Sequence, residues 1–276
     1  MDRTSGQLGF CGMGDTPLAA RAMLHHWEEP PISGTRGAGA VFFSGCSLGC
    51  AYCQNSPISH GGFGAPLTAG RLREIFLDLI GQGAHNIELV TATHFLPAIL
   101  PALTPKLPVP VGYESVETLR ELEGLVDIYL PDLKYAEADL AAALSNAPDY
   151  FPVACAAIDE MVRQVGPCQF DEDGLLTRGV VIRHLILPGQ VQNSLKVLDY
   201  VAEHFPKGTV LLSLMAQYIP AGKVETVPPY DRSISREEYE AVVSWLYMLG
   251  LEDGFLQEPD AASEEYVPDF SLEGVL

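Results

Sequence analysis

The chain has 276 residues and a mass of 29.8 kDa, which suits one large domain or one domain with an appendage. Hydrophobic residues make up 47% of it, enough to fill a core, so a disordered protein is excluded. Sixteen basic residues against 36 acidic ones give a net charge of −20. Since the sequence also has no long Lys/Arg run, we expect neither nucleic acid nor an anionic membrane surface as a partner.

The sequence indicates no membrane or secretory segment. It has no stretch of about 18 uncharged apolar residues, so no transmembrane helix is expected, and residues 1–4 lack the apolar core of a secretory signal. We therefore expect a cytoplasmic protein whose thiols stay reduced. Its six cysteines are then better interpreted as ligands, nucleophiles or core residues than as disulfides.

Strands and helices are predicted to alternate after a loop-rich N-terminal segment over residues 1–38. Runs of Val, Ile and Leu predict strands, and apolar residues at helical spacing predict helices. Ser235, with Glu238 three residues on, predicts a capping box at the start of the last helix. In chain order we expect strand 40–44, helix 67–82, strand 87–91, helix 96–103, strand 109–111, helix 116–122, strand 127–130, a helical region 137–165 with proline interruptions, strand 179–187, helix 194–204, strand 209–214 and helix 235–250.

Six strand-then-helix units of this kind predict an α/β fold with a parallel sheet buried on both faces. A Rossmann-like open sheet and an incomplete TIM-type barrel both fit, and periodicity does not separate them. In either fold, functional residues are expected where the strands end at their carboxyl edge. The expected organisation is an N-terminal extension over 1–38, the α/β core over 39–250 and an acidic C-terminal extension over 251–276.

The first predicted strand runs directly into a loop that carries Cys46, Cys50 and Cys53, at the spacing C-x3-C-x2-C. Three thiolates on one tight loop can hold three irons of a [4Fe–4S] cluster and leave the fourth iron open to a substrate. Gly45 and Gly49 allow the loop to wrap closely. One alternative is a structural zinc site with a distant fourth ligand, although no second C-x2-C pair is present. Another is that the three cysteines pack in the core as small hydrophobic residues.

The cysteine loop, with an aromatic residue before its last cysteine, resembles the signature of radical S-adenosylmethionine (SAM) enzymes. Further segments resemble the branch related to pyruvate formate-lyase activating enzymes and, within it, the PflX-like subgroup. The resemblance covers nearly the whole chain and is carried by residues 42–46, 52–55, 127–135, 183–189, 254–258 and 266–270.

This resemblance implies a partial (β/α)6 TIM-type barrel, the radical SAM core, with short N- and C-terminal extensions. It also implies a [4Fe–4S] cluster on the three cysteines and SAM on the open iron, which makes them the metal ligands. An electron from the reduced cluster would cleave SAM to methionine and a 5′-deoxyadenosyl radical, which abstracts a hydrogen atom from a substrate.

The resemblance and the residue chemistry together suggest further SAM contacts near the strand ends. Tyr52 would lie near the adenine, with loop packing as the alternative. Thr91 and Thr93 stand where many radical SAM enzymes carry a Gly-Gly-Glu-Pro-like segment for the methionine amine, and their hydroxyls could accept its hydrogen bonds. His94 beside them is a proton carrier, a substrate contact or an incidental helix-cap residue.

Three later strand ends complete the candidate set. Asp132 and Lys134 share one face of the strand end, and the matching segment of the activating-enzyme branch contacts SAM; a simple ion pair is the alternative. Arg183, inside an apolar run, suits the SAM carboxylate or a buried salt bridge. Gln217 could hydrogen-bond the adenine edge or the substrate.

Other singled-out residues carry weaker predictions. Cys155 and Cys168 lack ligand spacing and are expected to be structural. The sequence leaves open whether Cys11 or the His25–His26 pair binds metal, and we interpret the segment around that pair as a packing or lid element. The segment 112–115 is shorter than in the resembling subgroup.

The leading hypothesis is a radical SAM enzyme with one [4Fe–4S] cluster and a flavodoxin or ferredoxin-type reductant. One interpretation of its substrate, by family analogy alone, is a glycyl-radical protein that it activates. One alternative is radical modification of a small molecule or peptide. A second is a non-catalytic iron–sulfur redox protein, which the polar set around the cysteines disfavours because a carrier needs no SAM site. The substrate is not identified by the sequence.

Overall fold

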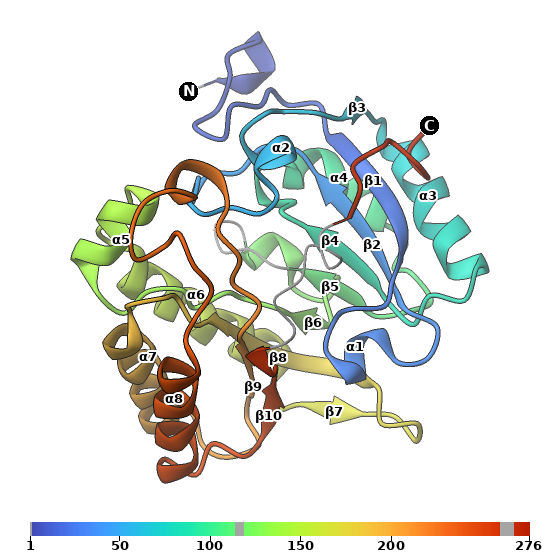
Figure 1. Cartoon of the computed structure of the whole chain (residues 1–276). Helices are drawn as coiled ribbons and strands as arrows, with labels where there is room; N and C mark the ends of the chain where they lie inside the picture. Colours follow the sequence, from blue (N-terminus) through green and yellow to red (C-terminus); the bar gives the residue numbers. More distant parts are fainter. Residues whose placement is uncertain (1, 114–118, 260–267) are drawn as a thin grey trace.

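The computed structural model describes residues 2–113, 119–259 and 268–276. It is a mixed α/β protein built on one ten-stranded sheet, whose path is β10-β9-β8-β6-β5-β4-β2-β1-β3, with β7 paired to β8 (Figure 1). Within the described residues no helix is both long and apolar enough to cross a membrane.

A parallel stretch forms the centre of the sheet. Among its members chain order and spatial order agree, because each pairs in parallel with the member that follows it in the chain, with β3 and β7 lying outside this stretch. Its members are β2 (Ala38–Phe43), β4 (Ile87–Val90), β5 (Val111–Tyr113), β6 (Ile128–Tyr129), β8 (Leu176–Leu185) and β9 (Leu211–Met215).

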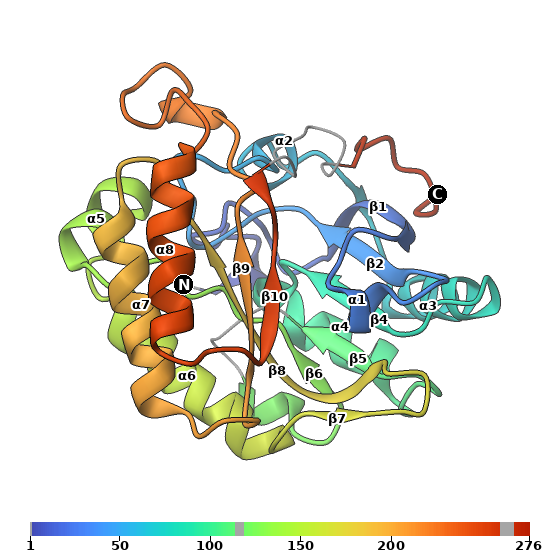
Figure 2. The same cartoon turned by 60° about the horizontal axis from the view of Figure 1, so that its bottom comes forward.

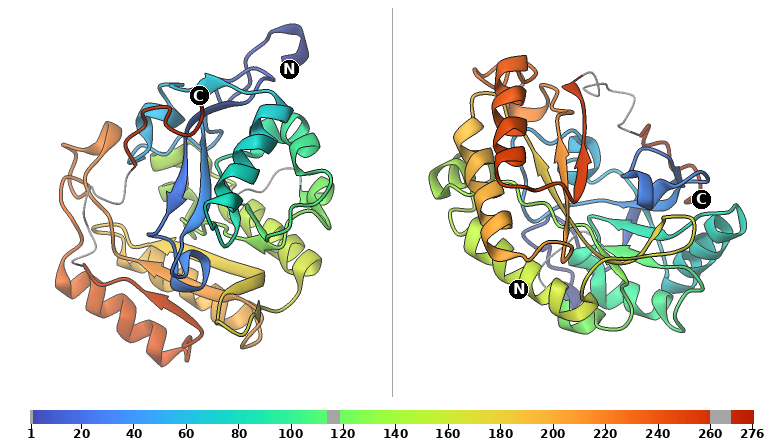
Figure 3. Two further views of the ribbon diagram at one scale, coloured as in Figure 1. Left: turned by 90° about the vertical axis from the view of Figure 1, so that its right-hand side faces the viewer. Right: turned by 90° about the horizontal axis from the view of Figure 1, so that it is seen from below.

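The connecting helices lie along the outside of the sheet, as the two views of Figure 3 agree. Short helices α1 (Pro30–Ser33) and α2 (Ser56–Ser59) flank β2. The longer helices are α3 (Ala69–Gly81), α4 (Leu96–Leu103), α5 (Ala138–Ser145), α6 (Tyr150–Val165), α7 (Val191–His204) and α8 (Arg236–Met248). The predicted helical region 137–165 thus forms two helices, which are separated at Asn146, a left-handed residue that caps α5.

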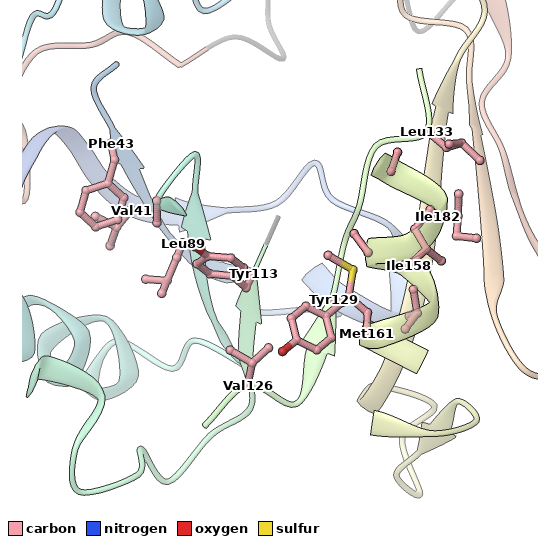
Figure 4. Packing of buried hydrophobic residues seen from close by; sticks show 14 of the residues in the cluster. Val41, Phe43, Leu89, Tyr113, Val126, Tyr129, Leu133, Ile158, Met161 and Ile182 are labelled. Atoms are coloured by element: carbon pink, nitrogen blue, oxygen red, sulfur yellow. The ribbon is translucent and has the colours of Figure 1, made fainter. Parts of the chain in front are cut away.

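The two faces of β2 contribute to two different hydrophobic clusters. Val41 and Phe43 belong to the main hydrophobic cluster, together with Leu72 and Phe76 of α3. Ala40 and Phe42 belong to a smaller cluster that also contains Val90. Figure 4 shows how the main cluster continues along the sheet, from Val41 and Phe43 through Leu89, Tyr113 and Tyr129 to Ile158, Met161 and Ile182. Burial of each such side chain stabilises the fold by about 2 kcal/mol.

The N-terminal segment is not loop-rich throughout, and that expectation is wrong over β1 (Leu18–His25). This strand pairs antiparallel with β2, and β3 (Ala65–Pro66) pairs with it in turn. Half of its positions are only partly buried and one of them is Arg21, so it lacks the apolar run that predicts a strand. Its strand character comes from pairing with β2, a contact between distant segments.

The C-terminal segment reaches both ends of the sheet. β10 (Gly254–Leu256) pairs parallel with β9 (Figure 2), and the last residues run beside β1 (Figure 1). There Leu272 N donates to Ala20 O at 3.0 Å and Ala22 N donates to Glu273 O at 3.0 Å.

The predicted start of the last helix agrees with the structure, since the capping box of Ser235 and Glu238 is confirmed. Other predictions fall partly outside the described residues. Of the predicted helix 116–122, the structure describes only residues 119–122, a 3-10 turn, and β7 (Gln169–Phe170) was not expected. The shortened segment at 112–115 and the segment 266–270 also extend into residues that are not described.

His184 on β8 is fully buried and joins three elements. Its Nδ1 lies 2.7 Å from the carbonyl oxygen of Leu133, which follows β6, and its Nε2 lies 2.9 Å from Ser194 Oγ on α7. Nδ1–H therefore donates to the carbonyl, and Nε2 accepts from the hydroxyl. Burial, assisted by the charge of Lys134, lowers the pKa of His184 to about 4.

This pKa makes the stability depend on pH in a defined direction. Between pH 6.5 and about 4 the unfolded chain binds a proton at residue 184 and the folded chain does not, so the free energy of unfolding falls by about 1.4 kcal/mol per pH unit from this residue. Urea unfolding of the wild type and of His184→Gln at pH 7 and pH 4.5 measures this effect. From pH 7 to pH 4.5 the free energy of unfolding should fall more for the wild type than for His184→Gln. A difference that does not change with pH would refute a buried neutral imidazole.

Candidate active site

One cavity of about 1030 Å³ collects the residues predicted from sequence. Cavity-lining residues come from the cysteine loop, the ends of β4, β8 and β9, the segment after β6, the edge strand β10 and the segment between β1 and α1. All ten predicted residues line it: Cys46, Cys50, Cys53, Tyr52, Thr91, Thr93, Asp132, Lys134, Arg183 and Gln217. Six parallel strands in chain order bring their carboxyl ends to one edge, which is why residues so far apart in sequence meet here.

The cysteine loop between β2 and α2 bends at two glycines. Gly45 has φ +83° and Gly49 has φ +61°, the left-handed region that side chains disfavour. A Cβ on Gly45 would lie 2.3 Å from Met13 Cγ and 3.0 Å from the Cys11 carbonyl oxygen. The N-terminal residues therefore pack directly on the turn that leads into Cys46.

The backbone of the loop is held from two sides at Ala51. Its N–H donates to the carbonyl oxygen of Leu144, near the end of α5, at 2.7 Å, and its own carbonyl accepts from Lys223 N at 2.7 Å. Gly222 makes the second contact possible, since its φ is +64° and a Cβ there would lie 2.5 Å from Ala51 O. The conformation between Cys50 and Cys53 thus depends on two distant parts of the chain.

The three thiols are free, and two of them have hydroxyl partners. Ser145 Oγ lies 3.2 Å from Cys50 Sγ, and Ser59 Oγ lies 3.2 Å from Cys53 Sγ. Burial raises the pKa of Cys50, against the opposing effects of the Lys134 charge and the Ser145 hydroxyl. Burial likewise raises the pKa of Cys53, against the Ser59 hydroxyl.

These features fit an iron–sulfur cluster, because the loop offers three thiol ligands with hydroxyl donors and a cation beside them. The structure does not itself show a metal centre. Among the described residues, no three or more His, Cys, Asp or Glu side chains are grouped so that they could hold a single metal ion. That finding includes Cys11 and the His25–His26 pair.

Asp132 and Lys134 form an ion pair of 2.7 Å on the cavity wall. Tyr150 fixes the segment between them, since its hydroxyl donates to Asp132 O at 2.6 Å and accepts from Lys134 N at 3.0 Å. Burial disfavours the charge of Lys134, but Asp132 and Cys50 raise its pKa well above the ordinary value. Lys134 is therefore a fixed positive charge near the cysteine loop.

Arg183 is buried and engaged with the segment between β1 and α1. Its Nε donates to Glu29 Oε1 at 2.9 Å, its Nη2 donates to Glu29 Oε2 at 2.7 Å, and Nη2 also contacts Glu28. Glu88 of β4 lies 3.9 Å away, and His25 Nε2 lies 3.5 Å from Glu28. The buried salt bridge that the sequence left open is therefore present, and a contact with SAM stays a prediction.

Thr91 and Thr93 follow β4 at the cavity wall. Thr91 has φ +59°, which costs on the order of 1–3 kcal/mol for a β-branched residue and is typical of functional positions. The backbone is thus strained where the methionine amine was predicted to bind. His94 contacts the cavity as well, but its Nε2 lies 2.7 Å from Ser44 O, and burial lowers its pKa.

Gln217 and Tyr52 are both engaged with protein groups. Gln217 Oε1 accepts from Gln257 Nε2 at 3.1 Å, so the C-terminal segment contributes to this wall. Tyr52 is 5% exposed, with its ring 6.5 Å from that of Tyr135 and 6.0 Å from that of Tyr218. Loop packing is therefore observed for Tyr52, and the adenine contact stays a prediction.

Several residues of the site were not identified from the sequence. Ser59 and Ser145 carry no motif, since a single serine signals a hydrogen bond only once the fold brings it to a partner. Glu28 and Glu29 were assigned to a lid segment without their partner Arg183, 154 positions away. Cys11 is buried near Arg3, and Cys168 lies near backbone carbonyls, outside the cavity lining.

No protein-family model matches the sequence. An uncharacterized protein of Methanocaldococcus jannaschii, MJ0674, is 26% identical over 248 residues, which cover 84% of this chain and 67% of that protein.

Solved structures show a fold relative. Two crystal structures of SuiB from Streptococcus suis, one bound to S-adenosylmethionine and one bound to the precursor peptide SuiA, each match with a TM-score of 0.50 and 12% identity. They cover 77% of this chain, and 48% and 46% of the SuiB chains. The chain therefore shares the fold of SuiB and spans about half its length.

The contact of Gly222 with Ala51 can be tested with a matched pair of variants. Gly222→Ala places a methyl group against the Ala51 carbonyl, whereas Gly208→Ala has a similar φ of +79° and no atom within 4 Å of the added Cβ. Both should lose about 1 kcal/mol of stability from the left-handed backbone, and Gly222→Ala should lose more because the Ala51 carbonyl must move. Only Gly222→Ala should bind at least twofold less iron on anaerobic reconstitution. Equal iron content per chain in the two folded variants would contradict the role assigned to this contact.

Proposed function

We propose that this protein is a radical SAM enzyme, with a [4Fe–4S] cluster on Cys46, Cys50 and Cys53 and SAM in the adjoining cavity. The observation that carries the proposal is the convergence of three free cysteines and seven predicted SAM-site residues on one cavity wall. The fold shared with SuiB, which was crystallised bound to S-adenosylmethionine, supports it. When bound, the cluster and SAM supply the reductive cleavage that yields a 5′-deoxyadenosyl radical for hydrogen abstraction.

The residues of the chain bind and orient in this proposal. Lys134 holds a positive charge beside Cys50 and so favours the thiolate that ligation requires. Asp132, whose side chain is 39% exposed, accepts hydrogen bonds from SAM hydroxyl groups. Thr91 and Thr93 accept from the SAM amine. Gln217 contacts the adenine edge.

The SAM contacts of Tyr52 and Arg183 are proposed together with the protein contacts that the structure gives these two residues. Tyr52 presents part of its ring to the adenine while its hydroxyl stays within the protein. Arg183 contributes charge to the SAM carboxylate while it remains bonded to Glu28 and Glu29, which fix its position.

The finer family placement is part of the same proposal. We infer that the parallel stretch from β2 to β9 is the partial (β/α)6 barrel of the radical SAM core, within 39–250, flanked by extensions over 1–38 and 251–276. The resemblance of the chain to pyruvate formate-lyase activating enzymes, and to the PflX-like subgroup, is supported by residues 52–55 after β2, 127–135 around β6 and 183–189 at the end of β8. A flavodoxin or ferredoxin would provide the electron.

The proposed substrate is a backbone glycine of a glycyl-radical protein, on the strength of that resemblance. A second candidate, radical modification of a peptide, is favoured by the SuiB structure with its precursor peptide. Both substrates are polypeptide segments, and the cavity wall at β10 and Trp27, which is 56% exposed, offers them an apolar approach.

Cleavage of SAM tests the proposed function directly. The anaerobically reconstituted protein, with dithionite and SAM, should form 5′-deoxyadenosine and methionine. Cys50→Ala should lose the cluster and the products, whereas Cys155→Ala, outside the cavity, should keep both. A wild type that holds a full cluster but neither binds nor cleaves SAM would support the non-catalytic redox protein instead.

Lys134 should matter for SAM more than a comparable surface lysine. Lys134→Met removes a partly buried charge of the cavity and should weaken SAM binding at least tenfold, because it leaves Asp132 without its 2.7 Å partner and removes the positive charge that acts on Cys50. Lys106→Met removes an exposed lysine, paired at 2.6 Å with Asp127 outside the cavity lining, and should change binding less than twofold. Calorimetric titration of the reconstituted variants with SAM measures both, and equal affinities would exclude Lys134 from the site.

A further inference from the structure

A line of three hydroxyl groups leads from the wall of the cavity to one of the cysteines. Tyr52 Oη lies 2.9 Å from Tyr135 Oη, which lies 2.8 Å from Ser145 Oγ, which lies 3.2 Å from Cys50 Sγ. The residues come from three elements: the cysteine loop, the segment after β6 and the last residue of α5.

All four side chains are buried. Their exposed fractions are 5% for Tyr52, 0% for Tyr135, 7% for Ser145 and 8% for Cys50. Burial raises the pKa of Tyr52 and Tyr135 far above the ordinary value, so both phenols keep their protons. In such a low-dielectric setting hydrogen bonds polarise one another, and an unmade bond is costly.

Counting protons fixes the direction of every bond once Cys50 is ionised. Each hydroxyl donates a single proton, and a thiolate only accepts. Ser145 must then donate to Cys50. Its proton is used, so Tyr135 must donate to Ser145. In the structure Tyr135 donates to Tyr52; once Cys50 is ionised this bond must reverse, so that Tyr52 donates to Tyr135, and hydroxyl protons can rotate to do so. No other assignment keeps all three contacts as hydrogen bonds.

We infer that Tyr52, Tyr135 and Ser145 form a hydrogen-bonded chain that donates stepwise to the Cys50 sulfur and raises the reduction potential of the cluster bound there. The inference rests on the proposed function, since it requires an iron–sulfur cluster at Cys50. Hydrogen bonds to cluster sulfurs stabilise the reduced, more negative state. Ser145 is the direct donor, and the two tyrosines act through it as positioning residues.

Potentiometric titration of the SAM-free, reconstituted protein, followed by electron paramagnetic resonance, tests the chain. Ser145→Ala should lower the reduced-to-oxidised ratio at a fixed potential about tenfold, a shift of about 59 mV for one electron. Tyr135→Phe should lower it about threefold and Tyr52→Phe less, because each is one bond further from the sulfur. Ser145→Thr, which keeps the hydroxyl, should restore the wild-type value.

Tyr218→Phe is the matched control. Its ring also packs on Tyr52, at 6.0 Å, but its hydroxyl donates to Tyr230 O at 2.8 Å, away from the chain. It should leave the potential unchanged. Electron–nuclear double resonance in D2O gives a second readout: one exchangeable-proton coupling, that of the Ser145 hydroxyl, should be present in the wild type and Ser145→Thr and lost in Ser145→Ala, whereas the coupling from Ser59 beside Cys53 should remain.

The possible failures are distinguishable. An intact cluster in Ser145→Ala with the wild-type potential and the full wild-type set of exchangeable-proton couplings overturns the hydroxyl chain and leaves the proposed function standing. An equal shift in Tyr218→Phe overturns it as well, because packing would then explain the change. A wild type that assembles no cluster overturns the proposed function and this inference with it.

Discussion

The contact between Arg183 and the pair Glu28–Glu29 is the interaction on which the architecture of the cavity depends. A guanidinium on β8, inside an otherwise apolar run, is costly to bury unless carboxylates meet it with good geometry. Glu29 supplies two hydrogen bonds, at 2.9 and 2.7 Å, from a segment 154 residues earlier in the chain. This requirement holds the segment that leads into α1 against the sheet, where it forms part of the cavity wall.

Local signals in the sequence predicted the elements that depend on local physics. The capping box at Ser235, the apolar stripe of α3 and the buried runs of β2 and β8 are encoded within a few neighbouring residues, and the structure has them within a few positions of the prediction. The cysteine spacing likewise indicated a loop with ligand character. The structure adds that its thiols lie on the wall of one cavity with the other predicted residues.

Features that depend on distant contacts could not be predicted in the same way. β1 is a strand because β2 offers it a partner, and its own residues, with Arg21 among them, carry no clear pattern. The salt bridge of Arg183 was one of two open alternatives, because a lone arginine does not reveal its partner. Ser145 and Ser59 become sulfur partners only through the packing of α5 and α2 on the cysteine loop.

The two backbone bonds of Ala51 have a consequence for the order in which the protein matures. One bond joins the cysteine loop to Leu144 and the other joins it to Lys223, so the loop is fixed only when residues far downstream have taken their places. During synthesis the three cysteines leave the ribosome early, but most of the chain must follow before their loop has its final shape. For the cluster proposed above, delivery of iron and sulfide is therefore expected to be a post-translational event on a nearly complete fold, rather than a nucleus around which folding begins.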